Sequence, residues 1–190
     1  MGESIGLIVI LAIAVLILMW AVSVYNRLVK LRQRVAEAWS GIEGQLKRRF
    51  NLIPNLVSTV EGYADHEKGT LEEVTAMRAR VQGAEGVAER GAAESKLSGA
   101  LMNLFAVAEN YPDLKASTNF LELQTELSDL EDQIHMARRY YNGSVRDLNT
   151  LIETFPSNLI AGQFKFKQAE YFEIGDAAER AVPKVDFGAS

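Results

Sequence analysis

The chain begins with an apolar segment that is long enough to cross a lipid bilayer. No charged residue occurs from Ser4 to Asn26, a run of 23 residues whose centre is almost purely aliphatic. About 20 residues of α-helix span the ~30 Å hydrocarbon core of a bilayer. We therefore predict a transmembrane anchor over residues 1–26, with Trp20 and Tyr25 in the aromatic belt at its interface with water.

Two other interpretations of this segment are weaker. A cleaved signal peptide would explain the small residues of Ala21-Val22-Ser23, but Met1-Gly2-Glu3 contains no Lys or Arg. The apolar run also exceeds the usual 7–15-residue core of a signal peptide. A buried core helix would need apolar neighbours, and no other segment is apolar enough to surround it. We therefore expect the segment to be retained as a signal anchor.

The charges that flank the apolar segment predict its orientation. Before the segment there is only Glu3. After it comes a basic cluster, formed by Arg27, Lys30, Arg32 and Arg34. Positively charged flanks remain on the cytoplasmic side, so we expect the N-terminus outside and residues 27–190 in the cytoplasm. Lys and Arg near an anionic leaflet each gain about 1 kcal/mol, which makes the lipid bilayer the first expected partner.

Composition excludes a large part of enzyme chemistry. The 190 residues include 20 Lys and Arg, 25 Asp and Glu, and no Cys. The chain therefore has no disulfide, no thiolate metal site and no cysteine nucleophile. Four prolines and 8% aromatic residues are too few for a typical β-sandwich, which favours an all-α fold.

Apolar residues recur with a helical period after residue 26. Reading in sevens from Leu28 gives two interleaved, mostly apolar series, as in the seam of a coiled coil: Leu28, Val35, Ile42, Arg49, Leu56, Tyr63, Thr70 and Met77, with Arg32, Trp39, Leu46, Ile53, Val60, Glu67, Val74 and Val81. Pro54 interrupts this run, and a proline inside a helix costs about 3 kcal/mol. Because the phase is kept across Pro54, we predict one long kinked helix to about Val81, with Glu67–Thr70 as the alternative break.

Turn signals separate the helices that follow. The small residues from Gln82 to Ala93 predict a flexible turn. The next helix should stop before Pro112, and Asn119 followed by Glu122 resembles a capping box at the start of another helix. These elements predict an elongated antiparallel helical bundle on the membrane anchor.

The last of these helices has the most regular pattern in the chain. Its apolar residues recur at intervals of seven: Phe120, Leu127, Ile134, Tyr141, Leu148 and Phe155. It should end at Phe155-Pro156. We expect part of the following segment to pack back on the bundle, which then covers residues 27–181, and we expect a flexible tail over residues 182–190.

The stem next to the membrane presents an apolar stripe, formed by Leu28, Val35, Trp39 and Ile42. The helix from Glu94 to Tyr111 covers only about 27 Å, so we expect this stripe to lack full cover within one chain. Exposed apolar stripes mark interaction surfaces, and a second copy of the chain is the expected partner. In the alternative, the segment from Phe164 to Phe172 folds over the stripe and leaves a monomer.

A second basic cluster, Lys47-Arg48-Arg49, has three interpretations. It is a solvated helix face, a salt bridge to another helix or subunit, or a contact to nucleic acid. The last is disfavoured because the chain lacks an extended basic stripe with interleaved aromatic residues. We expect no nucleic-acid partner and keep the three residues as candidate contacts to another subunit or protein.

No motif for catalysis is found. The phosphate-binding and nucleophile-elbow glycine motifs are absent, and the only histidines are His66 and His135. Asp132 and His135 have a spacing found in di-iron helical bundles, but such a site needs a second copy of the motif and further glutamates. We therefore predict no catalytic residue, no metal site and no cofactor.

The ordered motifs of this chain resemble the LemA family. The resemblance is carried by Tyr25-Asn26-Arg27-Leu28-Val29, Ala38-Trp39-Ser40-Gly41-Ile42, Leu52-Ile53-Pro54-Asn55-Leu56-Val57, Glu109-Asn110-Tyr111-Pro112-Asp113, Ala137-Arg138-Arg139-Tyr140-Tyr141-Asn142 and Phe155-Pro156-Ser157-Asn158-Leu159. It covers nearly the whole chain. It implies a bacterial single-pass inner-membrane protein with a helical bundle and without established enzymatic activity.

The resemblance also implies a role in the cell envelope. Members of the family are tied to envelope maintenance, and some occur beside a zinc membrane metalloprotease. Relatives in magnetosome-forming bacteria are associated with internal membrane compartments. We predict a non-enzymatic oligomeric scaffold or remodelling factor of the inner membrane. The alternative is a regulatory adaptor of a membrane protease or envelope stress system, and an enzyme is the poorest hypothesis.

Overall fold

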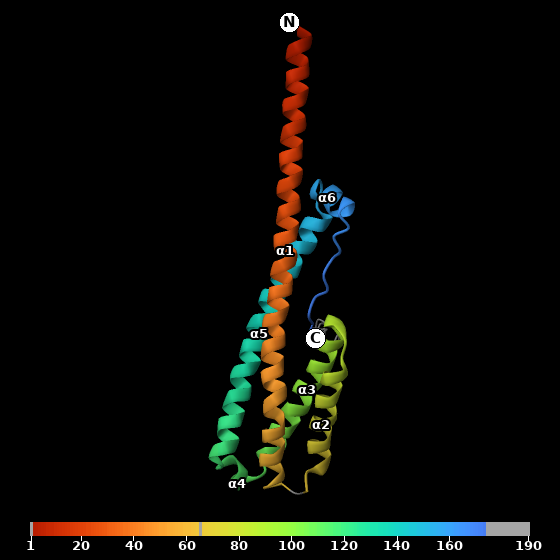
Figure 1. Ribbon diagram of the computed structural model, residues 1–190. Helices are drawn as coiled ribbons and strands as arrows, with labels where there is room; N and C mark the ends of the chain where they lie inside the picture. Colours follow the sequence, from red (N-terminus) through yellow and green to blue (C-terminus); the bar gives the residue numbers. More distant parts are fainter. Residues whose placement is uncertain (1, 65, 174–190) are drawn as a thin grey trace, which may run out of the picture. The chain divides into compact units, whose positions relative to one another are not determined.

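The computed structural model describes residues 2–64 and 66–173, which are helical with short connections and contain no strand (Figure 1). The helices are α1 (Gly2–Glu61), α2 (Lys68–Gly83), α3 (Gly86–Ala108), α4 (Pro112–Lys115), α5 (Thr118–Glu153) and α6 (Ser157–Gln163). The predicted all-α fold is confirmed.

The first helix continues without interruption from the apolar segment past Pro54 to Glu61. Within it, an 18-residue window has a mean hydropathy of 3.1, and none of that window is buried in the chain. This exposure excludes the core-helix interpretation. Pro54 lies inside α1, so the prediction that the helix continues past this proline is confirmed.

The predicted end of this helix at Val81 is wrong. α1 stops at Glu61, and α2 begins only at Lys68, next to the break that the weakened pattern at Glu67–Thr70 had indicated. The period of seven persisted because Val74 and Val81 of α2 are buried in the same core as Ile53, Leu56 and Val60 of α1, and Met77 packs against that core. The common phase of the two segments therefore reflects burial in one core, and it does not show that they form one continuous helix.

The backbone defect at Pro54 is compensated by a side chain from another helix. Proline has no N–H to donate to the carbonyl four residues earlier, which is that of Phe50. Arg78 of α2 donates its Nε–H to this oxygen over 3.1 Å. Its guanidinium carbon lies 3.9 Å from the centroid of the Phe50 ring, within cation–π range. The proline is thus tolerated because α2 supplies the missing donor.

Two other sequence-based boundaries are corrected. Only Ala84 and Glu85 separate α2 from α3, so the flexible turn predicted up to Ala93 is wrong. Gly86 has φ of 77°, a conformation that glycine adopts without strain, and this allows the tight connection. α5 begins at Thr118, so Asn119 lies within its first turn and does not cap it.

The chain divides into two compact units. Unit 1 comprises residues 1–44 and 135–170, and unit 2 comprises residues 45–134 and 171–190, of which residues beyond 173 lie outside the described part. The core of unit 1 contains Leu28, Leu31, Leu148 and Ala161. The core of unit 2 is formed by α1, α2, α3, α4 and α5. The predicted flexible tail, 182–190, also lies outside the described residues.

Candidate membrane-interface site

An aromatic cluster in unit 1 joins the end of the apolar segment to the segment after α6. The ring of Tyr25 lies 4.7 Å from that of Phe164 and 5.8 Å from that of Phe166, centroid to centroid. The guanidinium of Arg32 lies over Phe166 at 5.3 Å. Trp20, one turn before this cluster, is 39% exposed. Of the predicted interface residues, Tyr25 and Arg32 are therefore brought together by aromatic contacts.

The segment that runs from the end of α5 through α6 exposes large apolar side chains. We call residues 154–164 the elbow; within it Phe155 is 73% exposed, Leu159 61% and Phe164 56%. Leaving such side chains in water is unfavourable by about 25 cal/mol per Å² of apolar surface. Because Phe164 contacts Tyr25, the elbow holds an apolar surface beside the last residues of the uncharged run.

Three of the predicted interface cations border a groove between α1 and α5 of unit 1. Arg27, Lys30 and Arg34 contribute from α1, and Arg146 contributes from α5. The groove has a volume of about 580 Å³. Four cationic side chains converge here, and the sequence analysis had not singled out Arg146.

The apolar stripe of the stem is partly covered within the chain. Leu28 and Ile42 are fully buried, Val35 packs against the core of unit 1, and the ring of Trp39 lies 5.4 Å from that of Tyr141. The expectation that these positions lack full cover is therefore wrong for Leu28 and Ile42, whereas Val35 and Trp39 are half-buried. The cover of Leu28 and Val35 comes from the 36-residue α5 and from Ile160 and Phe166.

Polar contacts hold the segment after α6 on α5. The side-chain amide of Asn149 donates to the carbonyl of Ala169, and its oxygen accepts from the Ala169 N–H, both over 2.9 Å. The hydroxyl of Tyr141 donates to the carbonyl of Glu170 over 2.9 Å. Burial raises the pKa of Tyr141 above its usual value, with a smaller contribution from the charge of Glu170.

The second basic cluster is split between surface and core. Lys47 and Arg48 are exposed, and Arg48 reaches the amide oxygens of Gln45 and Gln133 at 3.5 and 3.4 Å. Arg49 is fully buried in unit 2. The salt-bridge interpretation is therefore correct for Arg49 and takes an intrachain form.

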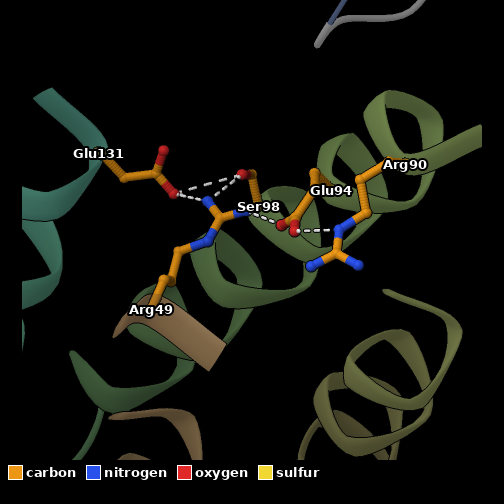
Figure 2. Close-up of polar contacts among 5 residues, drawn as sticks. All are labelled: Arg49, Arg90, Glu94, Ser98 and Glu131. Atoms are coloured by element: carbon orange, nitrogen blue, oxygen red, sulfur yellow. Dashed lines mark hydrogen bonds and ion pairs between the residues drawn. The ribbon is translucent and has the colours of Figure 1, made fainter. Parts of the chain in front are cut away.

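Figure 2 shows the charges that surround Arg49. Its guanidinium forms ion pairs with Glu94 of α3 and Glu131 of α5 and donates to Ser98 Oγ over 2.9 Å. Arg90 lies 3.3 Å from the other oxygen of Glu94. Two guanidiniums and two carboxylates balance, so the cluster presents no net charge to a ligand. The members of the cluster come from three helices, α1, α3 and α5, which suits a role in fixing the register of these helices.

Sequence reasoning missed Glu94, Ser98 and Arg146. A signal for the first was present, because Arg49 occupies a position of the apolar series and Glu94 lies three residues before Leu97 on the apolar face of α3. Opposite charges on the apolar faces of two helices predict an ion pair between them, here between Arg49 and Glu94. No comparable signal marked Arg146, since it is an exposed residue on the polar face of a long helix.

The described residues contain no group of three His, Cys, Asp or Glu that is placed to hold a metal. His135 Nδ1 lies 3.3 Å from a guanidinium nitrogen of Arg138, and His66 is exposed. The strongest polar features of this part of the chain are thus the neutral buried cluster and the cationic groove.

A family model described as the LemA family matches residues 38–187. Over 156 residues, the chain is 30% identical to a protein LemA of Metamycoplasma hominis; the match covers 80% of this chain and 69% of that protein. Over 184 residues, it is 27% identical to magnetosome protein MamQ 2 of Paramagnetospirillum magneticum, with 83% and 68% covered. The corresponding identity to magnetosome protein MamQ of Magnetospirillum gryphiswaldense is 26%.

Proposed function

The chain belongs to the LemA family, and from this premise we propose that it is a non-enzymatic scaffold that organises or remodels the bacterial inner membrane. It is membrane-associated through its apolar α1 segment. The scaffold role concerns what the folded part does at that membrane.

The contact between Tyr25 and Phe164 carries the proposal. α1 has no break between its apolar segment and the part that packs in the core of unit 1, so a continuous helix connects the folded residues to the bilayer. The ring contact at 4.7 Å places the exposed apolar elbow at the end of this segment. An apolar surface that enters one leaflet beside an anchor acts as a wedge, because it adds area to that leaflet alone.

The relatives favour this function over an enzymatic one. Three of them are named magnetosome proteins, and transfer of a membrane-organelle role to this chain is part of the proposal. In the described residues, the buried ionisable cluster around Arg49 is neutral and engaged by its own partners, which leaves it no evident substrate.

Reconstitution tests the proposal. Full-length protein in vesicles of phosphatidylethanolamine and phosphatidylglycerol should deform them, as seen by electron cryomicroscopy. Phe155→Ser/Phe164→Ser should reduce deformation. Met102→Ser/Leu121→Ser, at exposed apolar positions of unit 2, serves as the matched control and should not. Spherical vesicles at every protein density would contradict a remodelling role, and stoichiometric copurification of a membrane protease would favour the adaptor alternative.

Orientation is a separate part of the proposal. The basic cluster after the apolar segment supports a cytoplasmic position for residues 27–190. Protease added to spheroplasts should leave this region intact and should degrade it after lysis. Degradation in intact spheroplasts would reverse the assigned orientation.

Self-association completes the scaffold proposal, although the partly covered stripe no longer argues for it. The chain has no Cys, so single cysteines at the exposed positions Gln33 and Ser40 report only contacts between copies. Crosslinking in native membranes should give dimers or larger species that persist at low expression. Monomers at all expression levels would contradict an oligomeric scaffold.

A further inference from the structure

We propose that the groove between α1 and α5 binds the phosphate-bearing headgroup of an anionic phospholipid, with an acyl chain along the adjoining face of α1. The inference rests on the membrane anchoring described above. It goes beyond general attraction to a charged surface, because it assigns one site, its residues and its ligand class.

The charge of the groove selects an anion. Arg27, Lys30, Arg34 and Arg146 line it, and Asp147 is the single carboxylate among the lining residues. Among the described residues, none of these four cations forms a salt bridge. An excess of three positive charges in one groove is unfavourable without a counter-charge, and a phosphate accepts the forked hydrogen bonds of Arg and the point charge of Lys.

The spacing of these cations makes the groove a site and not a scattered surface charge. Arg27, Lys30 and Arg34 follow one another at intervals of three and four residues, which places them on one face of α1. Arg146 faces them from α5, with Thr150 of the same helix also in the lining. A volume of about 580 Å³ lies within the usual range for small-molecule sites.

A second hollow identifies the ligand as a lipid. It has a volume of about 630 Å³ and is lined by Leu18, Met19 and Val22 of the apolar segment together with Arg27 and Lys30. Arg27 and Lys30 therefore border both hollows. A surface that passes from aliphatic to cationic side chains along one helix face matches a molecule with an acyl chain and an anionic head.

The position along α1 agrees with the headgroup layer. Arg27 and Lys30 lie within about 6 Å of Asn26, the end of the uncharged run, at 1.5 Å per residue. Arg34 lies about 12 Å beyond Asn26, and a long Arg side chain can extend back toward the interface. The phosphates of a lipid leaflet occupy this layer just outside the hydrocarbon core.

Native mass spectrometry of the full-length protein in detergent tests the site. The detergent-solubilised chain is titrated with phosphatidylglycerol, with phosphatidylethanolamine and with inorganic phosphate alone. We expect phosphatidylglycerol to bind at least about tenfold more tightly than phosphatidylethanolamine, as two charge-assisted hydrogen bonds allow. Inorganic phosphate should bind more weakly still, because it has no acyl chain.

Matched variants separate the groove from diffuse attraction. Arg34→Gln/Arg146→Gln should weaken phosphatidylglycerol binding by about tenfold or more. Lys47→Gln/Arg139→Gln removes the same charge from the same two helices outside the groove and should change binding by less than about twofold. All four side chains are exposed, and far-ultraviolet circular dichroism should show both variants folded.

Three results would overturn the proposal: equal losses in the two double variants, no preference for phosphatidylglycerol, or binding of inorganic phosphate as tight as that of lipid. The last would assign the groove to a free anion. Lipid binding in detergent is measured without vesicles. If the protein deforms vesicles but shows no preference for phosphatidylglycerol, only the lipid-site proposal is contradicted. Protein that binds the lipid but leaves vesicles unchanged fails only the scaffold proposal.

Discussion

Units 1 and 2 differ in the burial and pairing of charged side chains. In unit 2, Arg49 is fully buried and shared between Glu94 and Glu131. In unit 1, Arg34 and Arg146 are exposed and face a groove with one carboxylate. Buried charges survive only with partners, whereas exposed ones remain hydrated and available. The Arg49 cluster of unit 2 is thus satisfied by partners within the fold, whereas the groove cations of unit 1 are available for the binding that we propose.

The largest expected effect is the loss of Arg49. Arg49→Ala leaves Glu94, which is 1% exposed, without its main partner, and removing one member of a buried pair costs about 3–5 kcal/mol. Arg34→Ala in unit 1 should change the free energy of unfolding by less than about 0.5 kcal/mol. Urea unfolding of the full-length protein in detergent, followed by circular dichroism, measures both. Equal effects would remove the distinction between the units.

Glycine substitutions test how closely other atoms pack around one glycine in each unit. A Cβ at Gly91, which is buried, would meet the backbone carbonyl oxygen of Glu173 inside contact distance. Gly91→Ala should therefore cost about 1–3 kcal/mol. A Cβ at Gly41 of α1 meets nothing within 4 Å, so Gly41→Ala should stabilise the helix by about 0.5–1 kcal/mol. Thermal unfolding of both variants checks the predicted difference in sign.

A double-mutant cycle tests the compensation at Pro54. Arg78→Ala should cost about 1–2 kcal/mol because the Phe50 carbonyl loses its donor. In a Pro54→Ala background the new N–H bonds this carbonyl, so the same change should cost about 1 kcal/mol less. Pro54→Ala alone should keep the fold and stabilise it. Additive costs in urea unfolding would contradict a role for Arg78 in replacing the missing hydrogen bond.

The smallest expected effect is at alkaline pH. The pKa of Tyr111 in unit 2 is raised first by its hydrogen bond to Glu67, whereas that of Tyr141 in unit 1 is raised first by burial. A folded pKa above the unfolded value gives stability that is present below about pH 10 and is lost as pH rises through the folded pKa.

Near-ultraviolet absorbance titration can separate the two tyrosines. Glu67→Gln should lower the pKa of Tyr111 toward its usual value and leave that of Tyr141 unchanged, since only Tyr111 bonds to Glu67. Tyr111→Phe and Tyr141→Phe assign the two transitions. A shift of both transitions in Glu67→Gln would contradict separate causes.

Local properties of the sequence determined a large part of the architecture. The uncharged run predicted the apolar start of α1, and the helical period predicted an all-α chain with a helix that continues past Pro54. Both predictions follow from hydropathy and residue spacing within one segment. Insertion into a bilayer and helix formation depend mainly on such neighbouring residues. The motifs also identified the family. The period of seven has the same phase before and after residues 62–67. Because this pattern reports only which residues are buried, it could not distinguish one helix from two helices that share a core.

Tertiary structure alone decided which residues became partners. Arg49 joins Glu94 and Glu131, 45 and 82 residues away, Arg78 completes the helix bond missing at Pro54, and Arg146 meets the basic face of α1. The cover of Leu28 by α5 and the segment after α6 had the same origin. Such pairings depend on how helices return past one another, and a period of 3.6 residues specifies which face is buried without specifying what buries it.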